Sequence, residues 1–234
     1  MSIIAGKRPD GDGEGPAPGG VVLADPADAA HLSVIVAAAF VSLAPSAWLI
    51  PDEPTRREIF PEYFRLYVDE AFASGTVYTN SDRTAVALWI TKPQQQNFAG
   101  RGAQPPRLTA NPAHAQDSEY DERLGAVTGP WAYRFREFDA ALDRHHPTGP
   151  AHHHLAILAV HPDVQHAGIG SALLAEHHRV LDAAGIPAYL EASDTRTRAL
   201  YLRVGYQDRG DPIQLPAKGP LMYPMVRRPV ARVQ

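Results

Sequence analysis

The stretch "LAVHPDVQHAGIGSALL" (158–174) joins one apolar run to another through a short polar loop. The pattern predicts a strand over 152–160 and a helix over 168–184, with Gly168 and Gly170 at the junction. A strand that leads through glycines into a helix is a common way to bind phosphate. The unpaired N–H groups and the dipole at a helix N-terminus both favour an anion.

Two familiar phosphate-binding patterns fail at this junction. A Walker loop requires lysine after its last glycine, but Gly170 is followed by Ser171. The dinucleotide fingerprint requires a third small residue where this chain has Leu173. The segment "QHAGIG" (165–170) instead satisfies the pattern Gln/Arg-x-x-Gly-x-Gly/Ala in full.

With this pattern the sequence resembles the GCN5-related N-acetyltransferase (GNAT) superfamily, whose motif binds the pyrophosphate of acetyl-CoA. A second block, "GIPAYLEASDTRTRALYLRVGYQ" (185–207), resembles the family's next strand and helix, which end in Leu-Tyr-x-x-x-Gly-Phe/Tyr. The similarity covers about 150–227. Within the family the chain is most similar to the branch that contains puromycin N-acetyltransferase, partly through "LMYPMVRRP" (221–229).

The resemblance implies an α/β protein of the GNAT fold, with a mixed, mostly antiparallel central sheet whose strands splay and are flanked by helices. The expected order of elements, β-α-α-β-β and then β-α-β-α-β, fits this class. We expect a flexible Gly/Pro-rich tail over 1–20 and a single acetyltransferase domain over 21–234. The CoA-binding core is expected at about 150–210.

The individual elements follow from local patterns. Apart from the junction, they are a strand over 21–23, a helix capped by Asp25 and begun by Pro26, a helical segment over 56–73 broken at Pro61, a hairpin over 76–91, a helix over 131–144, a strand over 187–192, a helix over 195–203 and a strand near 220–227. Residues 92–130, crowded with Gln, Pro, Gly and Asn, are expected to form a long loop with at most one helical turn. The uncharged stretch 32–50 is interrupted by Pro45, so a buried helix leading into an apolar loop is expected there rather than a membrane span.

Composition narrows the range of functions. The formal net charge of −4 gives no reason to expect nucleic-acid binding, and no membrane partner is expected. The chain has no cysteine, which excludes disulfides, thiolate zinc sites and a cysteine-based acyl-enzyme, and which suits a cytoplasmic protein. Whether the protein is a monomer or a homodimer is left open.

Acetyl-CoA is the cosubstrate that the resemblance implies. Its pantetheine arm would meet the backbone of the strand, and its pyrophosphate would meet the loop amides. The cofactor-binding residues implied in this way are Leu158, Ala159, Val160, Gln165, His166, Ala167, Gly168, Ile169, Gly170, Ser171 and Thr197. Thr197 stands where relatives often carry asparagine, so its contact has less reach. Arg196 and Arg198 are further candidates for contacting the CoA phosphates.

The catalytic candidates lie on the strands and helix around the loop. By resemblance, Tyr201 is the acid that protonates the departing CoA thiolate. Strand alternation places His152 and His154 on one face, where an imidazole is suited to accept the proton of the amine. Glu191 is the rival base or an anchor for the amine. Two histidines on one face can ligate zinc, but without a clear third ligand no metal is expected.

We therefore expect an acetyl-CoA-dependent N-acetyltransferase that acetylates a primary amine of a small molecule, such as an antibiotic or a metabolite, by direct attack in a ternary complex. Two alternatives stay open. The first is a non-catalytic acyl-CoA-binding regulatory protein, and the second is a protein lysine or N-terminal acetyltransferase.

Overall fold

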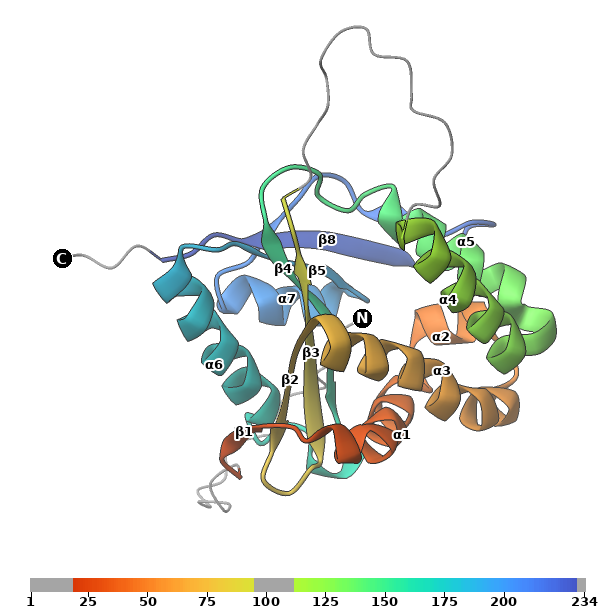
Figure 1. Cartoon of the computed structure of the whole chain (residues 1–234), viewed down its shortest axis with the longest axis horizontal. Coiled ribbons are helices and arrows are strands. Elements are labelled where there is room, and N and C mark those ends of the chain that lie inside the picture. The colour runs from red at the N-terminus through yellow and green to blue at the C-terminus, as the bar shows by residue number, and fades with distance from the viewer. Residues whose placement is uncertain (1–18, 95–111, 231–234) are drawn as a thin grey trace, which may run out of the picture.

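An eight-stranded sheet runs through the middle of the protein, with helices on both of its faces (Figure 1). The computed structural model describes residues 19–94 and 112–230. The sheet has the order β1-β2-β3-β4-β5-β8-β6, and β7 pairs with β8. The strands are β1 (Val21–Leu23), β2 (Gly75–Asn80), β3 (Ala85–Lys92), β4 (His152–Val160), β5 (Ala188–Ala192), β6 (Gln207–Asp208), β7 (Ile213–Gln214) and β8 (Leu221–Arg227).

Within the described residues only β4 and β5 pair in parallel, while the other ladders are antiparallel. The predicted fold class, an α/β protein with a mixed and mostly antiparallel sheet, is therefore confirmed. The helices are α1 (Ala29–Phe40), α2 (Ala44–Leu49), α3 (Glu53–Ser74), α4 (Pro112–Thr128), α5 (Ala132–Asp143), α6 (Ile169–Ala184) and α7 (Thr195–Arg203), with the 3-10 turns η1 (Pro26–Asp28), η2 (Gly129–Trp131) and η3 (Pro162–Val164).

The sheet separates two hydrophobic cores. On one face α1, α3 and α5 contribute Phe40, Phe60 and Phe135, which are fully buried. On the other face α6 packs Leu173 and Leu181 against the sheet, in the same core as the α7 residues. Burial of these apolar faces, at about 25 cal/mol per Å² removed from water, is the main force that holds the layers together.

Strand β4 contains a bulge that reverses the direction of its side chains. Leu88 of β3 is opposite Ile157 and Trp89 is opposite Leu155, so the register shifts here and Ala156 is the extra residue of the bulge. Ala156 and Ile157 consequently both belong to the first core, although a regular strand would place neighbours on opposite faces.

Helix α3 differs from the expectation of a break at Pro61. It runs without interruption over 22 residues, with Pro61 inside it. Proline removes one backbone hydrogen bond and normally disturbs a helix. Here Phe60 and Phe64 pack edge to face on each other at 5.3 Å between ring centroids, and both are buried. Core packing on both sides of Pro61 therefore outweighs the local cost of the proline.

The expectation of a long loop over 92–130 is wrong for its second half. Residues Pro112–Thr128 form helix α4, whereas residues 95–111 lie outside the described part. Tyr120, Leu124 and Val127 face the first core at helical spacing, and Leu124 is fully buried. This apolar face is only one residue wide per turn, so it was hidden among the polar residues of the segment.

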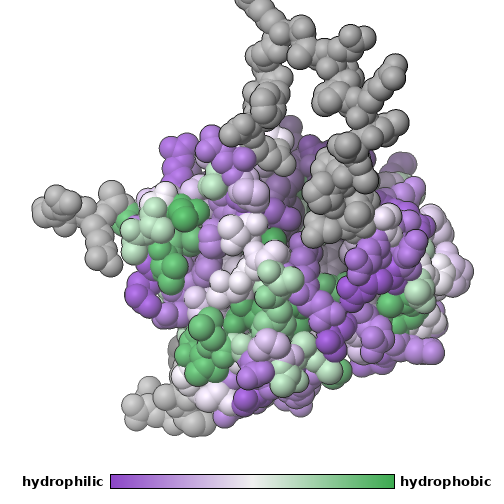
Figure 2. Space-filling model, in the orientation of Figure 1, coloured by the Kyte–Doolittle hydropathy of each residue, from purple (hydrophilic) through white to green (hydrophobic). Residues whose placement is uncertain are grey.

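The uncharged stretch 32–50 forms part of α1 and then α2, where a loop was expected. Pro45 occupies the first turn of α2, a position that proline tolerates. Of the helices in the described part of the chain, none is both long enough and apolar enough to cross a membrane. At the edge of the sheet, the three-residue strand β1 exposes Val22 and Leu23. Figure 2 shows apolar surface on the face of the protein drawn in Figure 1.

The second core holds a neutral histidine whose titration we expect to affect stability. His178 is 7% exposed, and its Nε2 lies 3.1 Å from the hydroxyl of Tyr206. Burial, with the nearby charge of Arg227, lowers the pKa of His178 from 6.5 to about 4. The unfolded chain therefore takes up this proton at a higher pH than the folded protein, and stability present above pH 6.5 is lost as the pH falls toward 4.

We predict that His178→Gln makes the stability less dependent on pH. Between pH 7 and pH 5 the wild-type protein should lose about 2 kcal/mol through this one group. Urea unfolding at the two pH values measures the loss in the wild type and in the variant. His145→Gln, which changes an exposed histidine, should keep the wild-type dependence. Equal losses in His178→Gln and in the wild type would contradict the prediction.

Candidate active site

Strands β4 and β5 diverge soon after they meet. Their parallel ladder has two pairs, His153 with Ala188 and His154 with Tyr189, and it continues no further within the described residues. On its other side β4 pairs with β3 from His152 to Val160, apart from the bulge. The edge of β4 that faces β5 is therefore open over residues 155–160, which include the predicted contacts Leu158, Ala159 and Val160.

The glycine loop follows this open edge directly. The side-chain amide of Gln165 donates to the carbonyl oxygen of Val160 at 3.0 Å and so ties the loop to the end of β4. His166 has a φ of 73° and Gly168 a φ of 79°, so both are left-handed. A Cβ on Gly168 would have no heavy atom within 4 Å, so the positive φ is what favours glycine there.

Helix α6 begins immediately after Gly168. Ile169 and Gly170 are buried at its first turn, Ser171 is half-buried, and His166 and Ala167 are exposed beside them. The first turn of a helix has backbone N–H groups without helical partners and carries the positive end of the dipole. The loop and the helix start thus place the predicted cofactor residues 165–171 around an end of α6 that favours an anion.

Thr197 lies at the start of α7 and is engaged there. Its hydroxyl oxygen accepts from the backbone N–H of Asp194 at 3.2 Å, and its own N–H donates to Oδ1 of Asp194 at 2.7 Å. This reciprocal pair is a capping box, and Thr197 is fully buried. Its hydroxyl therefore stabilises the start of α7, whereas the sequence had suggested only a contact with CoA.

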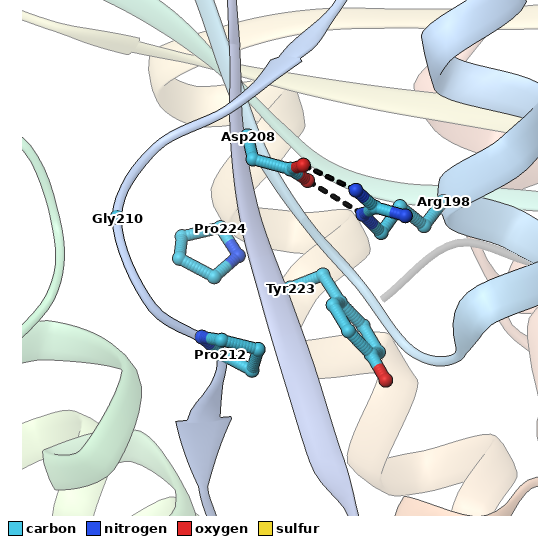
Figure 3. Close-up of a pocket in the computed structure, with 6 residues that line it drawn as sticks. All are labelled: Arg198, Asp208, Gly210, Pro212, Tyr223 and Pro224. Carbon is cyan, nitrogen blue, oxygen red and sulfur yellow. Dashed lines mark hydrogen bonds and ion pairs between the residues drawn. The ribbon is translucent and has the colours of Figure 1, made fainter.

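Arg198 lines a small surface pocket between α7 and β8 (Figure 3). Its guanidinium holds the carboxylate of Asp208 through two bonds, one of them 2.6 Å from Nε to Oδ1, and lies 5.8 Å from the ring centre of Tyr223. The hydrogen bond with Arg198 lowers the pKa of Asp208. Arg198 is thus already paired with an anion, which weakens its candidacy for a CoA phosphate.

Four polar side chains meet at the end of the β4–β5 ladder, and we call them the histidine–glutamate cluster: His146, His152, His154 and Glu191. Nε2 of His154 lies 2.9 Å from Oε2 of Glu191. Nδ1 of His146 lies 4.0 Å from Oε1 of Glu191, and Nε2 of His146 lies 3.0 Å from Nε2 of His152. The structure therefore brings the predicted base candidates together and adds His146.

Burial and charge set the protonation states in this cluster. Burial alone would raise the pKa of Glu191, but the charge and hydrogen bond of His154 outweigh it and bring that pKa to about 2. Burial, followed by the charge of His154, lowers the pKa of His146 to about 3. At neutral pH Glu191 is therefore a carboxylate and His146 a neutral imidazole. Oε1 of Glu191 is buried without a hydrogen-bond partner.

His153 points to the opposite face of β4, as strand alternation predicts. Its Nδ1 lies 2.9 Å from Nε2 of His177 on α6, and the ring of His177 stacks on Trp89 at 4.2 Å between centroids. His153 is thus separated from the histidine–glutamate cluster by the sheet and lies on the face that α6 covers.

Tyr201 is fully buried in the second core on α7, where its ring packs against Tyr206 at 5.4 Å between centroids. The predicted acid therefore lies on the face of the sheet that α6 and α7 cover, and the histidine–glutamate cluster lies at the strand ends.

His146 and Tyr189 are site residues that sequence reasoning missed. His146 precedes His152 by six residues, and "PTGP" (147–150) between them turns the chain back. Tyr189 lies two residues before Glu191, on the same face of β5, and its ring contacts His146 at 4.8 Å between centroids. Both could have been found from the sequence, His146 from the turn at 147–150 and Tyr189 from its spacing of two residues from Glu191.

Comparisons with known proteins agree with this geometry. Residues 131–208 match the family model for the acetyltransferase (GNAT) domain. A Corynebacterium glutamicum protein described as "histone acetyltransferase HPA2 and related acetyltransferase" is 24% identical, with a TM-score of 0.60 over 93% of this chain and 99% of that chain.

Two insect enzymes share the fold at lower identity. Polyamine N-acetyltransferase of Drosophila melanogaster is 15% identical, with a TM-score of 0.55 over 89% of this chain and 98% of its own. Arylalkylamine N-acetyltransferase 2 of Aedes aegypti is 9% identical, with a TM-score of 0.53 over 89% and 97%. The chain therefore contains a segment that matches the acetyltransferase (GNAT) domain model, and it shares the fold of these solved acetyltransferases.

Proposed function

We propose that the protein transfers the acetyl group of acetyl-CoA to a primary amine of a small molecule, by direct attack in a ternary complex. The observation that carries this proposal is the open edge of β4, which runs from the His154–Glu191 pair into the glycine loop and α6. One continuous segment thus offers a place for an acyl arm, an anion-binding helix start and a proton acceptor.

The residues present fit acetyl-CoA, which supplies the acetyl group as a thioester when it is bound. Backbone groups of Leu158 and Val160 lie on the open edge and would hold the pantetheine arm. The amides of residues 165–171 would hold the pyrophosphate, since the start of α6 favours an anion. The left-handed φ of Gly168 gives the loop the shape that brings β4 into this helix.

The cluster at the other end of the open edge would manage the amine. Glu191 accepts from Nε2–H of His154, and a neutral His154 then presents Nδ1 as a proton acceptor. As the amine nitrogen bonds to the acetyl carbon and the C–S bond breaks, His154 takes the amine proton. Tyr201 is the proposed proton donor to the sulfur.

A small-molecule acceptor is supported by the solved relatives that are named for agmatine, polyamines and arylalkylamines. The resemblance to the branch containing puromycin N-acetyltransferase adds drug-like amines to the candidates. Because these relatives show the fold rather than the substrate, the acceptor has to be found by a panel.

We predict CoA thiol release that depends on a small primary amine. A thiol reagent reports this release without background, because the chain has no cysteine. The panel should contain polyamines, arylalkylamines, puromycin and a lysine peptide, after calorimetry has shown that acetyl-CoA binds. Binding without release on any amine would favour a regulatory protein, and release with the peptide alone would favour a protein acetyltransferase.

The glycine loop can be tested by a matched pair of substitutions at the two ends of α6. Gly168 and Gly185 both have positive φ, at 79° and 68°, and a Cβ on either would have no heavy atom within 4 Å. Forcing alanine into this conformation costs about 1–2 kcal/mol. We expect Gly168→Ala to weaken acetyl-CoA binding about 5- to 30-fold in calorimetry. Gly185→Ala should lose comparable stability and keep the wild-type affinity, and an equal loss of affinity in both variants would count against the loop.

Tyr201→Phe tests the proposed acid, because it keeps the ring and removes only the hydroxyl. We expect kcat for thiol release to fall about 100-fold while the Kd for acetyl-CoA stays unchanged. Tyr206→Phe removes the neighbouring buried hydroxyl and should leave kcat within a few-fold of the wild type. If Tyr201→Phe keeps the wild-type kcat, the residue only packs the core.

A further inference from the structure

His146, His154 and Glu191 each offer a ligand atom, and these atoms lie within 4.8 Å of one another. We propose that the three side chains bind one divalent transition-metal ion of the zinc type, in a site that shares His154 and Glu191 with the proposed amine end of the acetyl-CoA cleft. This departs from the expectation of no metal, which depended on the lack of a third ligand beside the strand histidines. Beside His154, the structure supplies two further ligands, which are Glu191 on β5 and His146 in the turn before β4.

The hydrogen-bond network leaves two acceptors facing each other. Nδ1 of His152 lies 3.2 Å from the carbonyl oxygen of Pro150, which can only accept, so this nitrogen carries the proton. Nε2 of a neutral His152 is then an acceptor, and Nε2 of His146 must donate to it across 3.0 Å. A neutral His146 is consequently left with a lone pair on Nδ1, the atom 4.0 Å from Oε1 of Glu191.

Glu191 gives the second, independent observation. Its side chain is 2% exposed, and Oε1 has no hydrogen-bond partner within 3.5 Å among the described residues. The hydroxyl of Tyr189 is also buried without a partner, and it lies near enough that, after burial itself, the Glu191 carboxylate raises its pKa. A buried carboxylate oxygen without a donor is costly. Here it lies 4.0 Å from the lone-pair nitrogen of His146, and a cation placed between the two atoms would be attracted by both. A metal ion would satisfy both.

His154 completes the set. Its Nε2 now shares a proton with Oε2 of Glu191 across 2.9 Å. A divalent ion would replace that proton, as metal binding commonly does when ligands must be deprotonated. A neutral His154 that ligates through Nε2 carries its proton on Nδ1, so it does not accept the amine proton while the ion is bound. Two imidazole nitrogens and one carboxylate oxygen form the ligand set of many zinc sites that keep an open fourth position. Magnesium and calcium prefer sites built wholly from oxygen.

The surroundings hold these ligands in place. His154 and Tyr189 are paired across the β4–β5 ladder, and the ring of Tyr189 packs against both His146 and His154. A row of hydrogen bonds fixes the orientation of the His146 ring: His146 bonds to His152, and His152 bonds to the carbonyl oxygen of Pro150. Outer contacts of this kind commonly orient a ligating imidazole. Because these side chains are already held in place, they would lose little conformational entropy when the ion binds.

The test is a cobalt and zinc titration of the untagged full-length chain after treatment with EDTA, without acetyl-CoA or amine. We expect one Zn²⁺ per chain by calorimetry and visible d–d bands from Co²⁺. His146→Ala, His154→Ala and the isosteric Glu191→Gln should each abolish saturation at the concentration that fills the wild type. His152→Ala should weaken binding about 10- to 100-fold, because it removes only an outer contact.

His145→Ala is the matched control, since it removes the exposed histidine next to His146, and it should bind as the wild type does. Circular dichroism establishes that each variant is folded. The proposal is overturned if the wild type shows no saturable binding, or if binding survives in the folded Glu191→Gln and His154→Ala variants. Displacement of Co²⁺ by excess Mg²⁺ would also overturn it. None of these readouts requires acetyl transfer, so they are independent of the proposed function.

Discussion

The parallel pairing of β4 with β5 stops after two residue pairs, and the arrangement of the site depends on this early end. A longer ladder would have closed the edge of β4 and left no backbone groups for a bound arm. A shorter one would have separated His154 from Glu191, which the last pair brings within hydrogen-bond distance. The two strands are held together elsewhere, because β3 supports β4 and β8 supports β5 along their lengths.

The histidines of β4 show how one strand serves two environments. His154 faces the buried carboxylate of Glu191, whereas His153 faces His177 and Trp89 under α6. Each imidazole thus has a polar partner on its own side of the sheet, which reduces the cost of burying it. The three consecutive histidines therefore belong to two different sites: His152 and His154 to the histidine–glutamate cluster, and His153 to the contact with His177.

Much of the fold could be predicted because its signals are local. The strand over 152–160, the helix over 195–203 and the alternation of His153 with His154 follow from apolar spacing and glycine positions. Helix α4 and the continuity of α3 through Pro61 could not be predicted in this way. Both depend on core packing against residues distant in sequence, which outweighs local propensity.

The candidate site was also predictable only in part. His152, His154 and Glu191 were identified from strand patterns, but their contact with His146 depends on how a turn positions one ring against another strand. The engagement of Thr197 in a capping box was also hidden, since threonine at that position is equally compatible with a ligand contact. The capping contact is local, between Asp194 and Thr197, and short polar side chains commonly bond the nearby backbone in this way instead of a ligand.

Ala156, the extra residue of the bulge in β4, shifts the alternation of side chains along the strand. Before it the odd-numbered Leu155 belongs to the core under α6, and after it the even-numbered Leu158 and Val160 belong to that core. The bulge therefore lies between the part of β4 that carries the three histidines and the part that carries Leu158 and Val160 on the open edge. Deletion of this one alanine would leave a regular strand, in which Leu155, Leu158 and Val160 still face α6 and Ile157 and Ala159 still face the first core.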